Sequence, residues 1–142
     1  MQVVYSESHR GHHPRHFLVN GTVQQCPEVP ARADAFLAAV EGSGYEIVEP
    51  PDYGLEPVAA VHSAEYLHFL EHIHARWRRI DGASEEVVPN VHPNRTGTGY
   101  PDSAAGQAGY HMADTACPIS AGTWGAAVAS AGVATHAAEL GL

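Results

Sequence analysis

The order of secondary-structure signals at the start of the chain constrains its fold more than any other feature. Short β-prone runs at residues 3–5 and 45–48 predict two strands. Each run is followed by a segment with apolar residues at helical spacing, at residues 30–41 and 63–79. A strand–helix–strand–helix order predicts parallel strands joined by crossover helices. We therefore expect an α/β fold with an open parallel sheet flanked by helices.

The second of these helices carries the clearest signals. Ser63 is a candidate N-cap, and the helix is expected to end near Arg79. An apolar stripe along it predicts the face that packs into a core. The stripe consists of Tyr66, Leu70, Ile73 and Trp77, and Leu67 and Phe69 widen it.

Three further segments complete the survey of the chain. Residues 7–29 combine four His with Gly and Pro and are interpreted as a loop. Residues 81–104 show no periodicity, which predicts a long loop insertion that is either functional or disordered. Residues 122–140 are rich in Ala and predict a helix that packs tightly through small side chains.

The predicted sheet is incomplete. A parallel sheet needs both of its faces covered, and two or three strands are too few for independent stability. We therefore interpret residues 1–142 as the incomplete N-terminal part of one larger domain. Alone, such a chain is expected to aggregate or to remain partly molten.

Composition excludes several classes of protein. The chain has 142 residues, of which 44% are hydrophobic and 16% charged, which is typical of a globular protein. A net charge of −9 argues against nucleic acid as a partner, since a phosphate backbone calls for a basic surface. No apolar run approaches the roughly 20 residues that span a bilayer, and the start lacks the pattern of a secretion signal. We therefore expect a cytoplasmic protein without a membrane partner, in which Cys26 and Cys117 are reduced thiols.

Histidine is unusually frequent, with 11 residues in the chain. His68 and His72 are spaced i and i+4, so they share one face of the predicted helix. Such a pair either binds a metal ion or is an exposed surface pair without a ligand, and we favour the exposed pair. Eight of the histidines form two groups, one with His9, His12, His13 and His16 and the other with His62, His68, His72 and His74.

Catalytic motifs are scarce. Gly11-His12-His13 matches the triplet of zinc deacetylases, but no apolar strand precedes it, and a polar loop is the favoured interpretation. There is no nucleophile elbow and no Gly-rich phosphate loop, and residues 97–100 are too short to indicate a nucleotide site. Asp114 is either a capping residue or a carboxylate that faces substrate, and capping is favoured.

Four stretches nonetheless resemble one family. In order along the chain they are similar to its opening strand, its P-x-R-A helix start, its V-H-x-x-x-Y-L element and the segment before its Ala-rich helix. The chain thereby resembles the N-terminal portion of the acetylpolyamine amidohydrolase branch of the histone deacetylase family. The stretches are Val4–His9, Pro30–Ala33, Val61–Leu67 and Gly109–Trp124.

The resemblance implies an arginase-like open sheet and a zinc-dependent deacetylase. Members of the family bind one Zn²⁺ through two Asp and one His, and a His pair and a Tyr complete the active site. The motifs that carry these groups follow the matched region, and neither occurs in residues 1–142. We therefore expect no catalytic residue and no metal ligand in this chain.

The resemblance also implies roles for particular residues. Arg32 stands at the position of the family's arginine that lines the channel through which acetate leaves, although a surface Arg is an equal alternative. The acidic rim residue of the family aligns with Ala116, which departs from the pattern, and nearby Asp114 is a candidate substitute. Residues 81–104 look like a rim insertion that contacts a second subunit, which implies a possible homodimer.

These observations predict part of a zinc-dependent amidohydrolase that acts on acetylpolyamines or acetyl-lysine. Its origin is expected to be bacterial, because every basic residue is Arg and the chain is rich in Ala and Gly. Two alternatives remain open: a metal-binding protein that uses its His clusters, and a non-catalytic remnant with a structural role.

Overall fold

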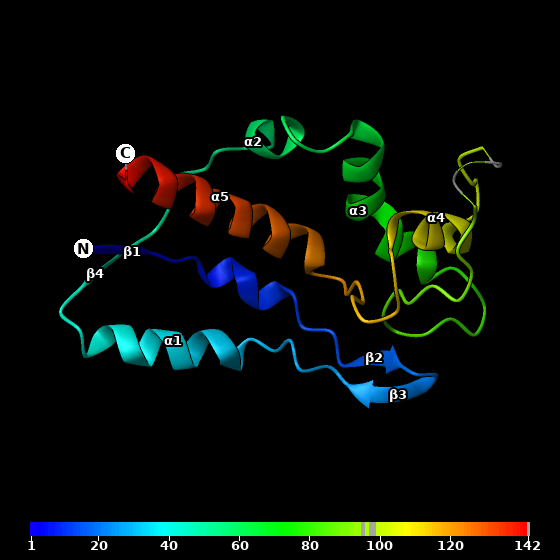
Figure 1. Cartoon of the computed structure of the whole chain (residues 1–142), viewed down its shortest axis with the longest axis horizontal. Helices are drawn as coiled ribbons and strands as arrows, with labels where there is room; N and C mark the ends of the chain where they lie inside the picture. The colour runs from blue at the N-terminus through cyan, green and yellow to red at the C-terminus, as the bar shows by residue number, and fades with distance from the viewer. Residues whose placement is uncertain (95, 97–98, 142) are drawn as a thin grey trace. The chain divides into compact units, whose positions relative to one another are not determined.

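The computed structural model describes residues 1–94, 96 and 99–141, and the predicted loop residues Gly97 and Thr98 lie outside this part of the chain. Figure 1 shows the elements along the chain. They form two compact units, which we describe separately. The first unit comprises Met1–His13, Glu28–Ser63 and Gly122–Leu142, and the second comprises Pro14–Pro27 and Ala64–Ala121.

The first unit contains the predicted parallel strands. Strand β1 (Gln2–Val4) pairs in parallel with β4 (Glu46–Val48), with Val3 opposite Ile47. Helix α1 (Ala31–Glu41) lies between them in the sequence, as a crossover connection requires. The strand–helix–strand prediction is therefore confirmed.

Three more helical elements belong to this unit. The Ala-rich segment forms α5 (Thr123–Gly141), which packs against β1, against a 3-10 helix η1 (Glu7–Gly11) and against the short helix α2 (Glu56–Ala59). The prediction of a helix that packs through small residues is confirmed. The interpretation of residues 7–29 as a loop is wrong, because η1 opens that segment with Ser6 as its N-cap.

The same segment contains a hairpin, which lies in the second unit. Strands β2 (His16–Val19) and β3 (Thr22–Gln25) pair antiparallel through a two-residue turn. Asn20 and Gly21 both have positive φ, at 52° and 74°, as a type I′ turn requires. An Asn-Gly pair adopts this conformation at little cost, and it fixes the register of the two strands.

The second unit also holds the protein's hydrophobic core. Helix α3 (Ala64–Trp77) packs against α4 (Ala104–His111), and Val87 forms an antiparallel bridge with Ile119. The predicted stripe of α3 is largely confirmed, but Phe69 is among its most buried residues, whereas Leu70 is only partly buried. The buried cluster consists of Phe69, Ile73, Trp77, Val87, Ala108, Met112 and Ile119.

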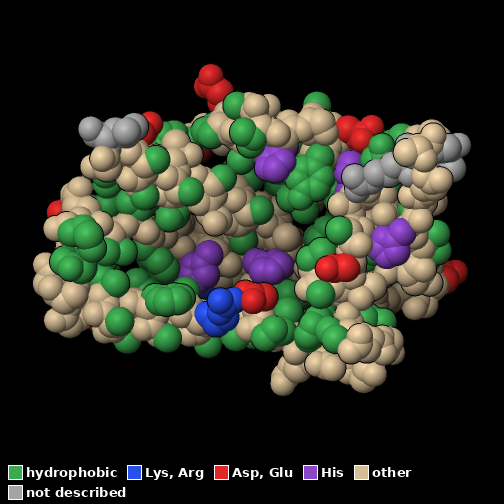
Figure 2. Space-filling model, viewed as in Figure 1, with side chains coloured by type: hydrophobic (Ala, Val, Ile, Leu, Met, Phe, Trp, Pro, Cys, Tyr) green, Lys and Arg blue, Asp and Glu red, His purple; other side chains and the backbone are tan. Residues whose placement is uncertain are grey.

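The two units differ sharply in burial. Among the described residues of the first unit, Ala126 is the sole hydrophobic residue that is buried. Phe36 on α1 is 70% exposed and Ile47 on β4 is 40% exposed. Figure 2 shows hydrophobic side chains at the surface over α1. The first unit therefore has layered elements without the buried core that layers of this kind normally enclose.

One glycine of the second unit tests its packing. A Cβ added at Gly109 would lie far inside van der Waals contact with the carbonyl oxygen of Val91, whereas a Cβ at Gly99 would meet nothing. We expect Gly109→Ala to destabilise this unit by about 3 kcal/mol, because a backbone carbonyl has to move. Chemical denaturation followed by tryptophan fluorescence measures the effect, with Trp124→Phe as the background so that buried Trp77 alone reports. Gly99→Ala is the control, and equal stability of the two variants would contradict this packing.

Candidate functional site

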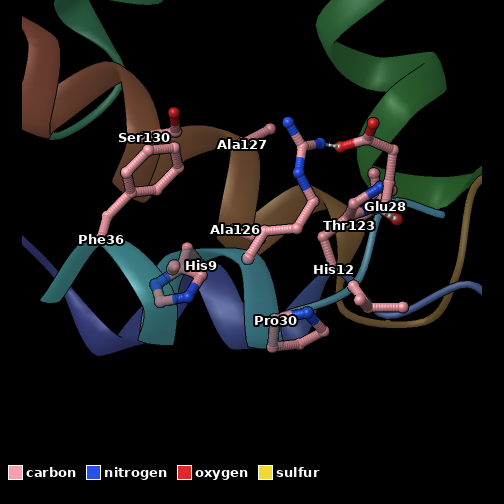
Figure 3. Close-up of a pocket in the computed structure, with 12 residues that line it drawn as sticks. His9, His12, Glu28, Pro30, Phe36, Thr123, Ala126, Ala127 and Ser130 are labelled. Carbon is pink, nitrogen blue, oxygen red and sulfur yellow. Dashed lines mark hydrogen bonds and ion pairs between the residues drawn. The ribbon is translucent and has the colours of Figure 1, made fainter. Parts of the chain in front are cut away.

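A pocket of about 440 Å³ lies in the first unit. It lies between the N-terminal turns of α1 and α5 and the 3-10 helix η1. In Figure 3, Phe36 and Ser130 lie at one end of the pocket and Glu28 and Thr123 at the other. Its wall is mostly apolar, with a few polar groups, which is the usual make-up of a ligand site. The lining residues are His9, His12, Glu28, Val29, Pro30, Arg32, Ala33, Phe36, Thr123, Ala126, Ala127 and Ser130.

Arg32, a predicted channel residue, lines this pocket. It stands in the first turn of α1, and its guanidinium pairs with Glu28, four residues earlier, by the dashed bond in Figure 3. Both side chains are more than half exposed. An exposed ion pair contributes at most about 1 kcal/mol, so another carboxylate can replace Glu28 at modest cost. The pocket therefore holds a guanidinium that is available to an anionic ligand.

His9 contributes an unusual polar atom to the same wall. Its Nδ1–H donates a hydrogen bond to the carbonyl oxygen of Ser6 at 2.7 Å. Its Nε2 is buried, and no hydrogen-bond partner for it lies among the described residues. A buried acceptor without a donor costs free energy. A ligand or side chain that donates an N–H or O–H to this atom would therefore bind favourably.

The Gly11-His12-His13 triplet is a packing element here. Gly11 ends η1, and its backbone lies so close to that of Gly122 that a Cβ at Gly122 would clash. This approach brings His12 Nδ1 within 2.8 Å of the Thr123 hydroxyl oxygen at the start of α5. His12 and His13 lie in a loop after η1, as predicted, and His12 is partly buried in it. Burial lowers the pKa of His12 below its ordinary value, which favours the neutral ring.

Asp114, the second predicted site residue, lies in the second unit. Its carboxylate accepts a hydrogen bond from the Ala116 backbone N–H at 2.8 Å and is exposed to solvent. It thus stabilises a local turn after α4, in line with the favoured capping role. Arg32 and Asp114 belong to different units.

A catalytic zinc ion needs three protein ligands in addition to water. Within residues 1–94, 96 and 99–141, no three His, Cys, Asp or Glu side chains are arranged to hold a metal ion. The described residues therefore do not fit zinc by themselves, and we assign them no step through the metal. Cys26 and Cys117 are both free thiols, as expected for reduced cysteines.

Sequence reasoning missed several residues of the pocket. Thr123 and Ser130 carry hydroxyls into it from α5, Glu28 neutralises Arg32, and Phe36 supplies an apolar wall. Glu28 was detectable in principle, because its spacing of i and i+4 to Arg32 is typical of an ion pair. The α5 residues belong to a stretch far away in the sequence, and no local pattern links them to α1.

The fold defines the class of protein. The crystal structure of acetylpolyamine aminohydrolase from Burkholderia pseudomallei superposes on this chain with a TM-score of 0.91 and 34% sequence identity. The superposition covers 99% of this chain and 41% of that one. The chain thus has the fold of an acetylpolyamine aminohydrolase, with parallel strands flanked by helices, and the predicted fold class is confirmed.

Sequence comparison points to the same proteins. The chain is 41% identical to acetylpolyamine amidohydrolase 1 of Pseudomonas aeruginosa, over 98% of its own length and 41% of that protein. It is 36% identical to the acetylpolyamine amidohydrolase of Mycoplana ramosa, over 99% of its length and 41% of that protein. No family model matches the chain. The predicted resemblance to acetylpolyamine amidohydrolases is confirmed, and the chain spans about two fifths of the length of these bacterial relatives.

The environment of His12 predicts a pH effect. Because its folded-state pKa lies below the unfolded value of about 6.5, the unfolded chain takes up more protons as the pH falls through that value. The folded state therefore loses stability between the two pKa values, and the effect vanishes above about pH 7. An NMR titration of the imidazole carbons measures the midpoint of His12 directly. A midpoint at or above 6.5 would contradict the burial of His12 against Thr123.

Proposed function

We propose that this chain forms part of a zinc-dependent deacetylase that releases acetate from N-acetylated amines such as acetylpolyamines or acetyl-lysine. The observation that carries the proposal is its match, in sequence and in fold, to proteins named acetylpolyamine amidohydrolase over nearly all of its length. Because the match covers 41% of those proteins, the proposal assigns the metal ligands and the catalytic His pair to polypeptide outside these 142 residues.

Zinc, when bound, would polarise the amide carbonyl and activate water. The residues of this chain would serve the product side of the reaction. Acetate is a small carboxylate, and the guanidinium of Arg32 matches a carboxylate with two parallel N–H bonds. Its present partner is the exposed carboxylate of Glu28, so the exchange replaces one ion pair with another of the same geometry. Arg32 would thereby hold acetate in the pocket while it leaves the active site.

Asp114 would act on the substrate side. Its carboxylate is exposed, and Ala116, at the position of the family's acidic residue, offers none. A carboxylate at the rim attracts the protonated amine of a polyamine tail, and the net charge of −9 adds a general attraction for cations. This role for Asp114 is part of the proposal and rests on its exposure and charge alone.

Other properties of the protein remain predictions. None of the described helices combines the length and the apolar character that crossing a bilayer requires. We propose a cytoplasmic location and a homodimer through residues 81–104, as the sequence predicts. Among the described residues of that segment, Val87 forms an isolated bridge with Ile119, and α4 begins at Ala104.

A chimera tests the proposed function. Residues 1–142 would replace the matching portion of the Pseudomonas aeruginosa amidohydrolase 1, to which they are 41% identical. We expect the purified chimera to deacetylate N-acetylated amines, to lose activity on chelation and to regain it with zinc. A chimera that folds and binds zinc but leaves every acetylated amine intact would show that this portion does not belong to a deacetylase.

The same chimera tests Arg32. We expect Arg32→Ala to lower kcat about tenfold, which corresponds to roughly 1.4 kcal/mol, because acetate release loses its guanidinium. Arg32→Lys should recover only part of the rate, since an ammonium cannot form the paired bonds. Arg15→Ala removes an Arg of similar exposure in the second unit and is the matched control. Equal kcat values for Arg32→Ala and Arg15→Ala would contradict a role for Arg32 in the channel.

A further inference from the structure

Two histidines on α3 form a close pair at the protein surface. His68 and His72 are one helical turn apart, and their ring centroids are 4.4 Å apart with the planes inclined at 66°. Both side chains are exposed, which confirms the sequence interpretation of an exposed pair. Exposure leaves ring nitrogens accessible to an ion from solvent, so the pair is open to ligands as well as to water.

The helix holds this pair on a rigid support. Phe69, Ile73 and Trp77 anchor the opposite face of α3 in the buried core of the second unit. The backbone positions of His68 and His72 are therefore fixed before any ion arrives, and the side-chain rotamers alone have to adjust. A preorganised pair gains affinity, because the second ligand binds as an intramolecular step.

Glu71 places a carboxylate near one ring of the pair, although beyond hydrogen-bond distance. Its carboxylate Oε2 lies 3.9 Å from His72 Nδ1, with both side chains about half exposed. A carboxylate beside Nδ1 favours the tautomer in which Nδ1 carries the proton. The lone pair is then on Nε2, which is the nitrogen that would bind a metal ion.

We propose that His68 and His72 form a two-imidazole chelate for an exchangeable divalent transition-metal ion of the copper and zinc class. Imidazole nitrogens suit these ions, and among them Cu²⁺ binds most tightly to a given nitrogen site. Since no third metal-ligating side chain joins the pair in the described chain, water fills the remaining positions. The pair belongs to the second unit and the pocket at Arg32 to the first, and the inference does not rest on the proposed deacetylase function.

The test is a titration of the full chain with Cu²⁺ alone at pH 7, in a buffer that does not bind copper. Calorimetry gives the affinity of the tightest site, and NMR shows which imidazoles broaden at substoichiometric Cu²⁺. We expect His68 and His72 to broaden first. Removing one ligand should weaken the tightest site about tenfold or more in both His68→Ala and His72→Ala, because the chelate is lost.

Two matched variants separate the chelate from a general histidine effect. His74→Ala removes a histidine of the same helix, whose Nε2 bonds to the Glu85 carbonyl oxygen at 3.1 Å, and should leave the affinity unchanged. A64H combined with H72A rebuilds the i and i+4 spacing with His68 at an exposed position and should restore it. Equal losses in His74→Ala and His72→Ala, or no loss in His72→Ala, would overturn the proposal.

Discussion

The parallel pairing of β1 with β4 is the interaction on which the first unit depends. Parallel strands need helices on both faces of the sheet, and here two strands of three residues each present faces that stay largely uncovered. Ile47 is partly exposed on β4, and Ala126 is the sole buried hydrophobic residue among the described part of this unit. Hydrogen bonds of so short a ladder contribute little unless apolar burial accompanies them. The same elements in the Burkholderia pseudomallei enzyme are part of a chain more than twice as long.

The second unit, in contrast, has a buried apolar core. Its hairpin is fixed by Asn20-Gly21, and its helices α3 and α4 enclose a dense apolar cluster around Ile73 and Val87. Apolar burial stabilises a unit of this kind, whereas the first unit buries little apolar surface. This contrast explains why the pocket at Arg32 is wide and open to solvent. Its walls are helix termini that approach one another through Gly11 and Gly122, with little apolar packing behind them.

The sequence predicts the long elements well, because their signals are periodic and local. The helices at residues 30–41, 63–79 and 122–140 and both parallel strands occur within one or two residues of the expected bounds. The hairpin was missed although Asn20-Gly21 is a strong turn signal, since the density of His, Gly and Pro around it favoured a loop. Helix α4 was missed because Gly106 and Gly109 weaken its helical pattern. Gly109 allows close packing against the Val91 carbonyl, which local patterns do not reveal.

The candidate site was predictable only in part. Resemblance pointed to Arg32, and the structure places Arg32 on the wall of a pocket. The partners that give this pocket its chemistry, Thr123 and the buried Nε2 of His9, come from segments far apart in the sequence. The close approach of Gly11 and Gly122 and the contact of His12 with Thr123 join those segments, and the spacing of residues along the chain does not reveal these contacts.

The most direct test of the account uses the isolated chain. Pure protein consisting of Met1 to Leu142 would be incubated with an N-acetylated amine, with and without added Zn²⁺, and free amine and acetate would be quantified. The account predicts release no faster than in buffer under both conditions, since the hydrolytic groups are assigned to other polypeptide. Zinc-dependent hydrolysis by this chain alone, above that of buffer with zinc, would contradict it.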